Sequence, residues 1–207
     1  MRETATALSE LRSATRALHE QLEASLPVAD ANAGREEFLH YLQDMWGWLS
    51  GFEAQLWQAE WPSGMNAAAR DGKLAWIETD LRAAGMAGAA LASLPQAGYR
   101  PALDTPAARF GVAYVIEGAQ LGGRVLGRTL APALGDWTPR WLQGYGEEQA
   151  RYWQAFIRCA ESALVTQEAR REAAAAAAQA FSSLAAWFAQ RQRMRAGNEV
   201  RRVPDAA

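Results

Sequence analysis

Two side chains near the start of the sequence could together hold a metal ion. His19 is followed four residues later by Glu23, which places the imidazole and the carboxylate on one side of a helix. Arg12 and Thr15 lie on the same side. A carboxylate at this spacing can accept the proton of one imidazole nitrogen and leave the other neutral and oriented, as a metal ligand requires. Because leucines flank His19 at helical spacing, it could also be an ordinary histidine at the edge of a core.

The only other histidine, His40, stands in a second pattern with metal-ligand spacing. Glu37 and His40 form a Glu-x-x-His pair, which in helical bundles can supply half of a di-iron site. A second pair of this kind is absent from the sequence. We therefore interpret Glu37 and His40 as an exposed pair in the first turn of a helix. Any histidine chemistry must use His19 or His40.

Glycines recur at helical spacing in residues 114–128. The four glycines concerned are Gly118, Gly122, Gly123 and Gly127. Each glycine inside a helix costs about 1 kcal/mol relative to alanine, so together they forgo roughly 3 to 4 kcal/mol. Either two helices cross closely at these glycines, or a flat ligand lies against the backbone. The size of the cluster favours a ligand face.

Composition limits the class of protein. The 207 residues suffice for one domain with a sizeable core. A net charge of -2 argues against a nucleic-acid partner. Because no apolar run approaches a membrane span and the N-terminal residues lack a secretory apolar region, we expect a soluble, cytoplasmic protein without a membrane partner. The single cysteine, Cys159, excludes an intramolecular disulfide and a multi-cysteine metal site.

Hydrophobic periodicity predicts an all-α, single-domain fold with about six main helices. No useful period-2 alternation and no phosphate-binding loop occur. Thr105 and Thr166 are expected N-caps, and Pro106 occupies the favoured first position of a helix. The expected helices are 6–26, 35–61, 66–84, 106–130, 147–165 and 167–195, with short helix and loop over 85–106. We expect residues 1–195 to form the domain and residues 196–207 a flexible C-terminal tail.

Two of these segments resemble helices of heme oxygenases. Residues 11–23 (Leu-Arg-Ser-Ala-Thr-Arg-Ala-Leu-His-Glu-Gln-Leu-Glu) are similar to the proximal helix of that family, and residues 114–123 (Tyr-Val-Ile-Glu-Gly-Ala-Gln-Leu-Gly-Gly) to its distal helix. The second motif resembles in particular the bacterial branch often associated with bacteriophytochromes. Further similarity in residues 73–85, 144–156 and 180–187 extends over nearly the whole domain. The resemblance implies a bundle that holds heme between a proximal helix and a kinked distal helix.

The resemblance also implies roles for single residues. His19 matches the axial ligand of the heme iron, and Glu23 the carboxylate that orients it. Gly118 and Gly122 match distal glycines whose backbone lies against the heme face. Arg12 matches a basic residue for a heme propionate, and seven residues of helix span about 10 Å, a sensible reach from iron to porphyrin edge. The remaining candidates for heme contact are Thr15, Gly123 and, as a weaker second propionate partner, Arg158.

The activity implied by the resemblance is oxygen-dependent cleavage of heme to biliverdin, carbon monoxide and ferrous iron. Heme would be both substrate and cofactor, and dioxygen the co-substrate. Such a reaction implies an electron donor such as a ferredoxin or a flavoprotein reductase. A phytochrome that uses biliverdin is a further possible partner.

One position departs from the family pattern. Many animal members carry an aspartate directly after the first distal glycine, where it organises water for proton delivery, and related bacterial sequences usually carry serine; this chain has Ala119. Proton delivery must then use backbone groups, ordered water or another residue such as Gln120. Two alternatives stay open: a heme-binding carrier or sensor on the same fold, and a di-iron oxidase or thiaminase-like use of a similar fold, which the missing second Glu-x-x-His pair disfavours.

Overall fold

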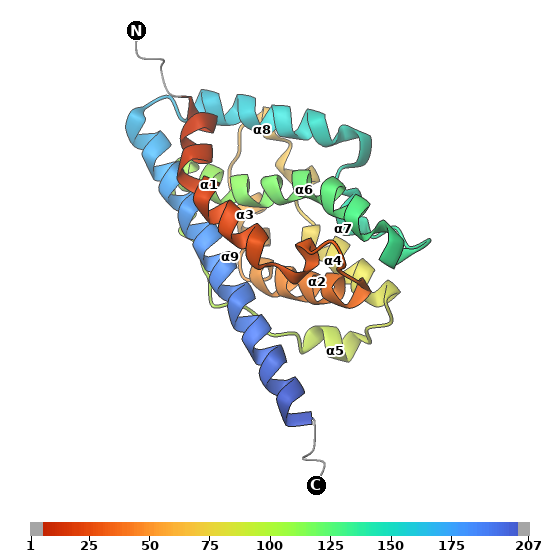
Figure 1. Cartoon of the computed structure of the whole chain (residues 1–207). Helices are drawn as coiled ribbons and strands as arrows, with labels where there is room; N and C mark the ends of the chain where they lie inside the picture. Colours follow the sequence, from red (N-terminus) through yellow and green to blue (C-terminus); the bar gives the residue numbers. More distant parts are fainter. Residues whose placement is uncertain (1–5, 203–207) are drawn as a thin grey trace.

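Helices form in this protein where apolar residues recur at three- and four-residue spacing. The computed structural model describes residues 6–202, with side chains to Asn198, and this part of the chain contains helices and no strands (Figure 1). The predicted all-α class is therefore confirmed. The α-helices are α1 (Ala7–Ser25), α2 (Arg35–Leu49), α3 (Glu53–Gln58), α4 (Lys73–Ala83), α5 (Gly88–Ala92), α6 (Pro106–Leu134), α7 (Arg140–Gln143), α8 (Gln149–Ala163) and α9 (Gln167–Arg202). Short 3-10 turns are η1 (Pro27–Ala29), η2 (Ser63–Met65), η3 (Ala67–Ala69) and η4 (Gly146–Glu148).

The predicted N-caps are confirmed. The Thr105 hydroxyl oxygen accepts a hydrogen bond from the Ala108 N–H at 3.1 Å, and Pro106 follows as the first residue of α6. The Thr166 hydroxyl oxygen accepts from the Ala169 N–H at 3.1 Å. These bonds satisfy N–H groups that have no partner inside the helix, so they fix where α6 and α9 begin.

The prediction of one helix over residues 35–61 is wrong. A Cβ atom on Gly51 would lie 2.2 Å from the end of the Arg100 side chain and 3.1 Å from the Tyr99 carbonyl oxygen, so the absence of a side chain lets residues 99–100 pack closely here. Phe52 follows with φ -155° and ψ -10°, outside the helical region, and ends the run. The break turns Glu53 inward. Its carboxylate accepts hydrogen bonds from the first two N–H groups of α4, at 2.7 and 2.8 Å.

Other boundaries differ from the sequence prediction for local reasons. Gly72 has φ 104°, a left-handed conformation, so α4 begins only at Lys73. The four residues of α7 are too few for periodicity to reveal. Residues 196–202, predicted as tail, continue α9, and residues 203–207 lie outside the described residues.

The long C-terminal helix α9 is the scaffold of the bundle. It packs along both α1 and α6, whereas α1 and α6 make few contacts with each other. Figure 1 shows α1 and α9 crossing α6, with α8 on one side of α6 and α2 and α4 on the other. Ala173, Ala177 and Ala180 form a fully buried stripe on α9. A Cβ on Gly111 of α6 would lie 2.2 Å from the Ala173 carbonyl oxygen, so the two backbones nearly touch at this crossing.

No helix in the described part of the chain is both long and apolar enough to cross a membrane.

Candidate functional site

Helix α1 is held at both ends. The Glu161 carboxylate of α8 accepts hydrogen bonds from the first two N–H groups of α1, at 3.0 and 3.1 Å. The Arg170 Nε donates to the Glu10 carboxylate at 3.1 Å. At the other end, the Gln192 amide of α9 donates to the Ser25 carbonyl oxygen at 3.1 Å. These contacts fix the helix while leaving the middle of its outer face free.

His19 lies on that outer face. Its Nδ1 is 3.3 Å from a Glu23 carboxylate oxygen, and the two side chains are 52% and 64% exposed. The imidazole meets the edge of Phe181 on α9, with ring centroids 5.7 Å apart and an angle of 69° between the planes. In the part of the chain that the structure describes, Nε2 makes no hydrogen bond. The arrangement leaves one ring nitrogen free to bind an exogenous group.

The remaining candidates on α1 and α8 fall into two kinds. Arg12 and Arg158 are exposed, on α1 and α8 respectively, and neither forms an ion pair among the described side chains, residues 6–198. Thr15 is buried, and its hydroxyl donates to the Leu11 carbonyl oxygen at 2.8 Å. Its hydrogen is thereby used inside α1, so Thr15 faces the core rather than the free face.

The glycines of α6 serve two different purposes. A Cβ atom on Gly118 or Gly122 would meet no atom within 4 Å. By contrast, a Cβ on Gly123 or Gly127 would contact Leu142 of α7, at 3.6 Å and 3.8 Å. Gly123 and Gly127 therefore face a neighbouring helix, whereas the Cβ positions of Gly118, which is half-buried, and Gly122, which is exposed, point into open space; we call this side of α6 the open face.

The open face is also apolar. Leu121 and Val125 flank the two glycines and are 36% and 58% exposed. Gly111, seven residues before Gly118, lies on the same side of α6 and is where α9 crosses. Close helix crossing thus explains Gly111, and it does not explain Gly118 or Gly122.

Ala119 and Gln120 lie differently. Ala119 is half-buried beside the open face. Gln120 is buried, and both polar atoms of its side chain lack a hydrogen-bond partner among the described residues. Its Oε1 lies 3.0 Å from the position of a Cβ on Gly144. Because Gln120 is about 200° around the helix from Gly118, its side chain points away from the open face.

A buried ionic cluster, which sequence reasoning missed, lies behind the open face. Glu117 is 1% exposed, and its carboxylate contacts the fully buried guanidinium of Arg70 and lies 3.0 Å from the Lys73 Nζ. The Tyr145 hydroxyl donates to Glu117 at 2.9 Å and accepts from Lys73 at 2.8 Å. Burial and the charge of Glu117 raise the pKa of Tyr145 well above its usual value. The phenol therefore remains protonated and a donor.

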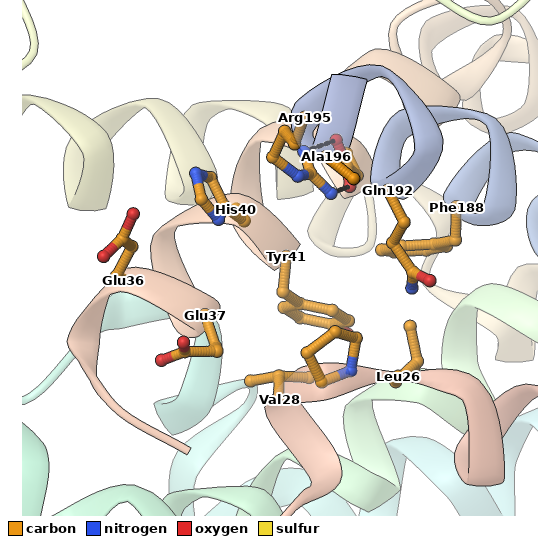
Figure 2. A pocket seen from close by; sticks show the side chains of 12 residues that line it. Leu26, Val28, Glu36, Glu37, His40, Tyr41, Phe188, Gln192, Arg195 and Ala196 are labelled. Atoms are coloured by element: carbon orange, nitrogen blue, oxygen red, sulfur yellow. Dashed lines mark hydrogen bonds and ion pairs between the residues drawn. The ribbon is translucent and has the colours of Figure 1, made fainter. Parts of the chain in front are cut away.

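His40 belongs to a separate cavity of about 330 Å³ between α2 and the end of α9 (Figure 2). Asp44 accepts hydrogen bonds there from Arg191 at 3.0 Å and from Arg195 at 2.9 Å. Burial and the charge of Arg195 lower the pKa of His40. The neighbouring Glu37 accepts from the N–H before α2 at 2.8 Å, so it caps the helix. The described residues contain no group of three or more metal-ligating side chains.

Comparisons with known proteins identify the family and the fold. A family model for heme oxygenase matches residues 5–190. The fold is similar to that of heme oxygenase from Neisseria meningitidis, known from crystal structures with NO and CO bound. The two chains are 18% identical, the TM-score is 0.71, and the match covers 90% of this chain and 92% of the other. A search of curated proteins found no match. Because the family model spans most of the sequence, the chain belongs to the heme oxygenase family.

Proposed function

We propose that this protein cleaves heme with dioxygen to biliverdin, carbon monoxide and ferrous iron. In this reaction heme would be both substrate and cofactor. The observation that carries the proposal is the open face of α6. Gly118 and Gly122 sacrifice helix stability where no part of the described chain packs, which is reasonable if a flat ligand covers them.

The residues of the site fit heme in shape and in chemistry. A porphyrin is flat and largely apolar, as the face formed by Gly118, Leu121, Gly122 and Val125 requires. The unpaired Nε2 of His19 would bind the iron. When bound, heme supplies the iron at which dioxygen is reduced and the ring that is oxidised.

Each side chain then has a definable task. Glu23, 3.3 Å from the His19 Nδ1, would accept the proton of that nitrogen, which would fix the tautomer and leave the Nε2 lone pair for the metal. Arg12, exposed on the same helix, would bind a heme propionate through two parallel hydrogen bonds. Arg158 is a second candidate for that contact.

Proton delivery must work without a side-chain donor at residue 119. Ala119 has none, and Gln120 points towards Gly144 rather than towards the open face. Backbone groups of α6 and ordered water are therefore the groups we propose for this role.

The reaction consumes electrons, so we propose a ferredoxin or a flavoprotein reductase as donor and the cytoplasm as its location. The motif at residues 114–123 supports membership of the bacteriophytochrome-associated branch, with a biliverdin-using phytochrome as a possible consumer of the product.

A heme carrier or sensor is the second candidate, favoured by the absence of a side-chain proton donor at Ala119. One experiment separates the two. Heme and a reductant are added to the protein under air, and the absorption spectrum is followed. Loss of the Soret band with growth of a biliverdin spectrum supports the enzyme. A persistent Soret band would indicate the carrier and refute the proposed activity.

A further inference from the structure

We propose that Glu117, Arg70, Lys73 and Tyr145 form a rear clamp that positions the open glycine face of α6. The inference rests on the proposed function, because it assigns these residues the task of holding the surface against which heme would lie. They are positioning residues, since none of them reaches the open face itself.

The position of Glu117 on the helix is the first argument. Successive residues of a helix are about 100° apart around its axis. Gly118 faces outward, with no atom within 4 Å of its Cβ position, whereas the preceding Glu117 faces inward and is 1% exposed. Any movement of the Glu117 backbone is therefore transmitted directly to the first glycine of the face.

The partners of Glu117 tie α6 to three other parts of the bundle. Lys73 is the first residue of α4, and its ammonium lies 3.0 Å from the Glu117 carboxylate. Arg70 contacts the same carboxylate and donates to the Tyr152 carbonyl oxygen of α8 at 2.8 Å. Tyr145, in the turn before α8, donates to Glu117 at 2.9 Å. One carboxylate thus joins α6 to α4, to α8 and to the turn between α7 and α8.

Lys73 is further confined by aromatic rings and by a second carboxylate. Its Nζ lies 5.1 Å from the ring centroid of Trp57 and 5.6 Å from that of Trp76. The Glu53 carboxylate accepts from the Lys73 N–H at 2.7 Å. The Glu53 carboxylate thus binds the backbone at the start of α4, whereas both buried cations, Arg70 and Lys73, pair with Glu117.

Net stabilisation is a poor explanation for such a cluster. Removing the three charges of Glu117, Arg70 and Lys73 from water costs about as much as their mutual attraction returns, so apolar residues of similar size would often serve stability as well. What buried ion pairs do provide is a fixed geometry, because every donor and acceptor has one favourable partner. Gly118 and Gly122 have no packing partner on their own side, so the position of this part of α6 must be set from behind.

The test uses Glu117→Gln and Tyr145→Phe, with Asp44→Asn as matched control. Asp44 is also a buried carboxylate held by two cations, but it joins α2 to α9. Tyr145→Phe removes the hydrogen bond to Glu117 and the one from the Lys73 Nζ while keeping the ring, which stacks on Tyr152 with centroids 4.1 Å apart. This milder variant decides the question if Glu117→Gln does not fold.

The first measurement is amide hydrogen exchange of the heme-free protein. Both clamp variants should speed exchange in residues 118–127 about tenfold, the effect expected for the loss of one charge-assisted hydrogen bond, and should change α9 much less. Asp44→Asn should speed exchange in α2 and the end of α9 and leave residues 118–127 unchanged. If the clamp variants sped exchange equally throughout the chain, or left exchange in residues 118–127 unchanged, the clamp would be refuted.

The second measurement is made with heme bound. Glu117→Gln removes the carboxylate that pairs with both buried cations, so the added positive potential should raise the iron reduction potential. Tyr145→Phe preserves every charge and should leave the potential near that of the unchanged protein. Both should weaken heme binding in a Soret titration, and unchanged affinity in both would contradict the inference. If the wild-type protein bound no heme, the proposed function would be refuted. Hydrogen exchange in the heme-free protein would still test whether the clamp positions residues 118–127.

Discussion

Adding a methyl group to the open face of α6 should stabilise the heme-free protein. Alanine is favoured over glycine inside a helix by about 1 kcal/mol. At Gly118 and at Gly122 the new Cβ would meet no atom within 4 Å, so no steric cost offsets this gain. For a chain of 207 residues, about 1 kcal/mol corresponds to a rise in Tm of roughly 2 to 4 °C. Gly118→Ala and Gly122→Ala should each show it in thermal melts of the heme-free protein.

The matched control is the glycine at the helix crossing. The Cβ of Gly111→Ala would lie 2.2 Å from the Ala173 carbonyl oxygen and 2.8 Å from the Ala176 Cβ. Because neither neighbour is the end of a flexible side chain, the helices must move apart. Overpacking of this kind costs about 1 to 3 kcal/mol. The upper end of that range exceeds the gain of about 1 kcal/mol in helix propensity. The same substitution should therefore lower Tm at residue 111 and raise it at residues 118 and 122.

A larger side chain connects this stability argument with function. Gly122→Leu should give a folded heme-free protein with at least the stability of the starting chain, because leucine is also a better helix former than glycine. The isobutyl group would occupy the surface proposed for heme, so heme affinity and biliverdin formation should fall steeply. Melting curves are measured beside Soret titrations and turnover. A variant that melts lower yet still cleaves heme normally would refute the assignment of Gly122 to a ligand face.

Three further predictions concern the other parts of the site and His40. His19→Ala should change the ferric heme spectrum and abolish turnover, with partial restoration by added imidazole, whereas His40→Ala should do neither; an unchanged spectrum in the first would remove the assignment. Arg12→Ala should weaken heme binding more than Arg158→Ala does, and equal affinities in a Soret titration would reassign the propionate contact. The pKa of His40 is lowered by burial and by Arg195, so the unfolded chain binds more protons here and stability falls as pH drops through the unfolded pKa of about 6.5. His40→Gln should lessen that loss in urea melts between about pH 5 and 7, and an identical pH slope would exclude this explanation.

Local patterns were the predictable part of this protein. Caps at Thr105 and Thr166 depend on residues three positions away, so the sequence predicts them correctly. The approach of His19 to Glu23 follows from i+4 spacing in the same way. The break near Gly51 was missed because the residues packed against it, Tyr99 and Arg100, come from a loop distant in sequence.

The buried cluster behind α6 was unpredictable for the same reason. Glu117 is 47 residues from Arg70 and 28 from Tyr145 in the chain. Its own neighbours in sequence are apolar or small, which gives no sign of a charged partner. Sequence reasoning also treated the four glycines as one stripe. The structure divides them into two faces, because Leu142 packs against Gly123 and Gly127 and not against Gly118 or Gly122.

The alanine stripe of α9 makes the separation of α1 and α6 a property of a third helix. Ala173, Ala177 and Ala180 are buried, Ala173 and Ala177 lie against Gly111 of α6, and α9 also packs along α1. A single methylene gained or lost in this stripe would alter the spacing between the two helices without replacing any residue proposed to touch heme. Variants of this protein could therefore accommodate a thicker or thinner ligand through substitutions distant from the ligand. Substitutions in the stripe would change the spacing between α1 and α6, while the side chains proposed to contact heme stay the same.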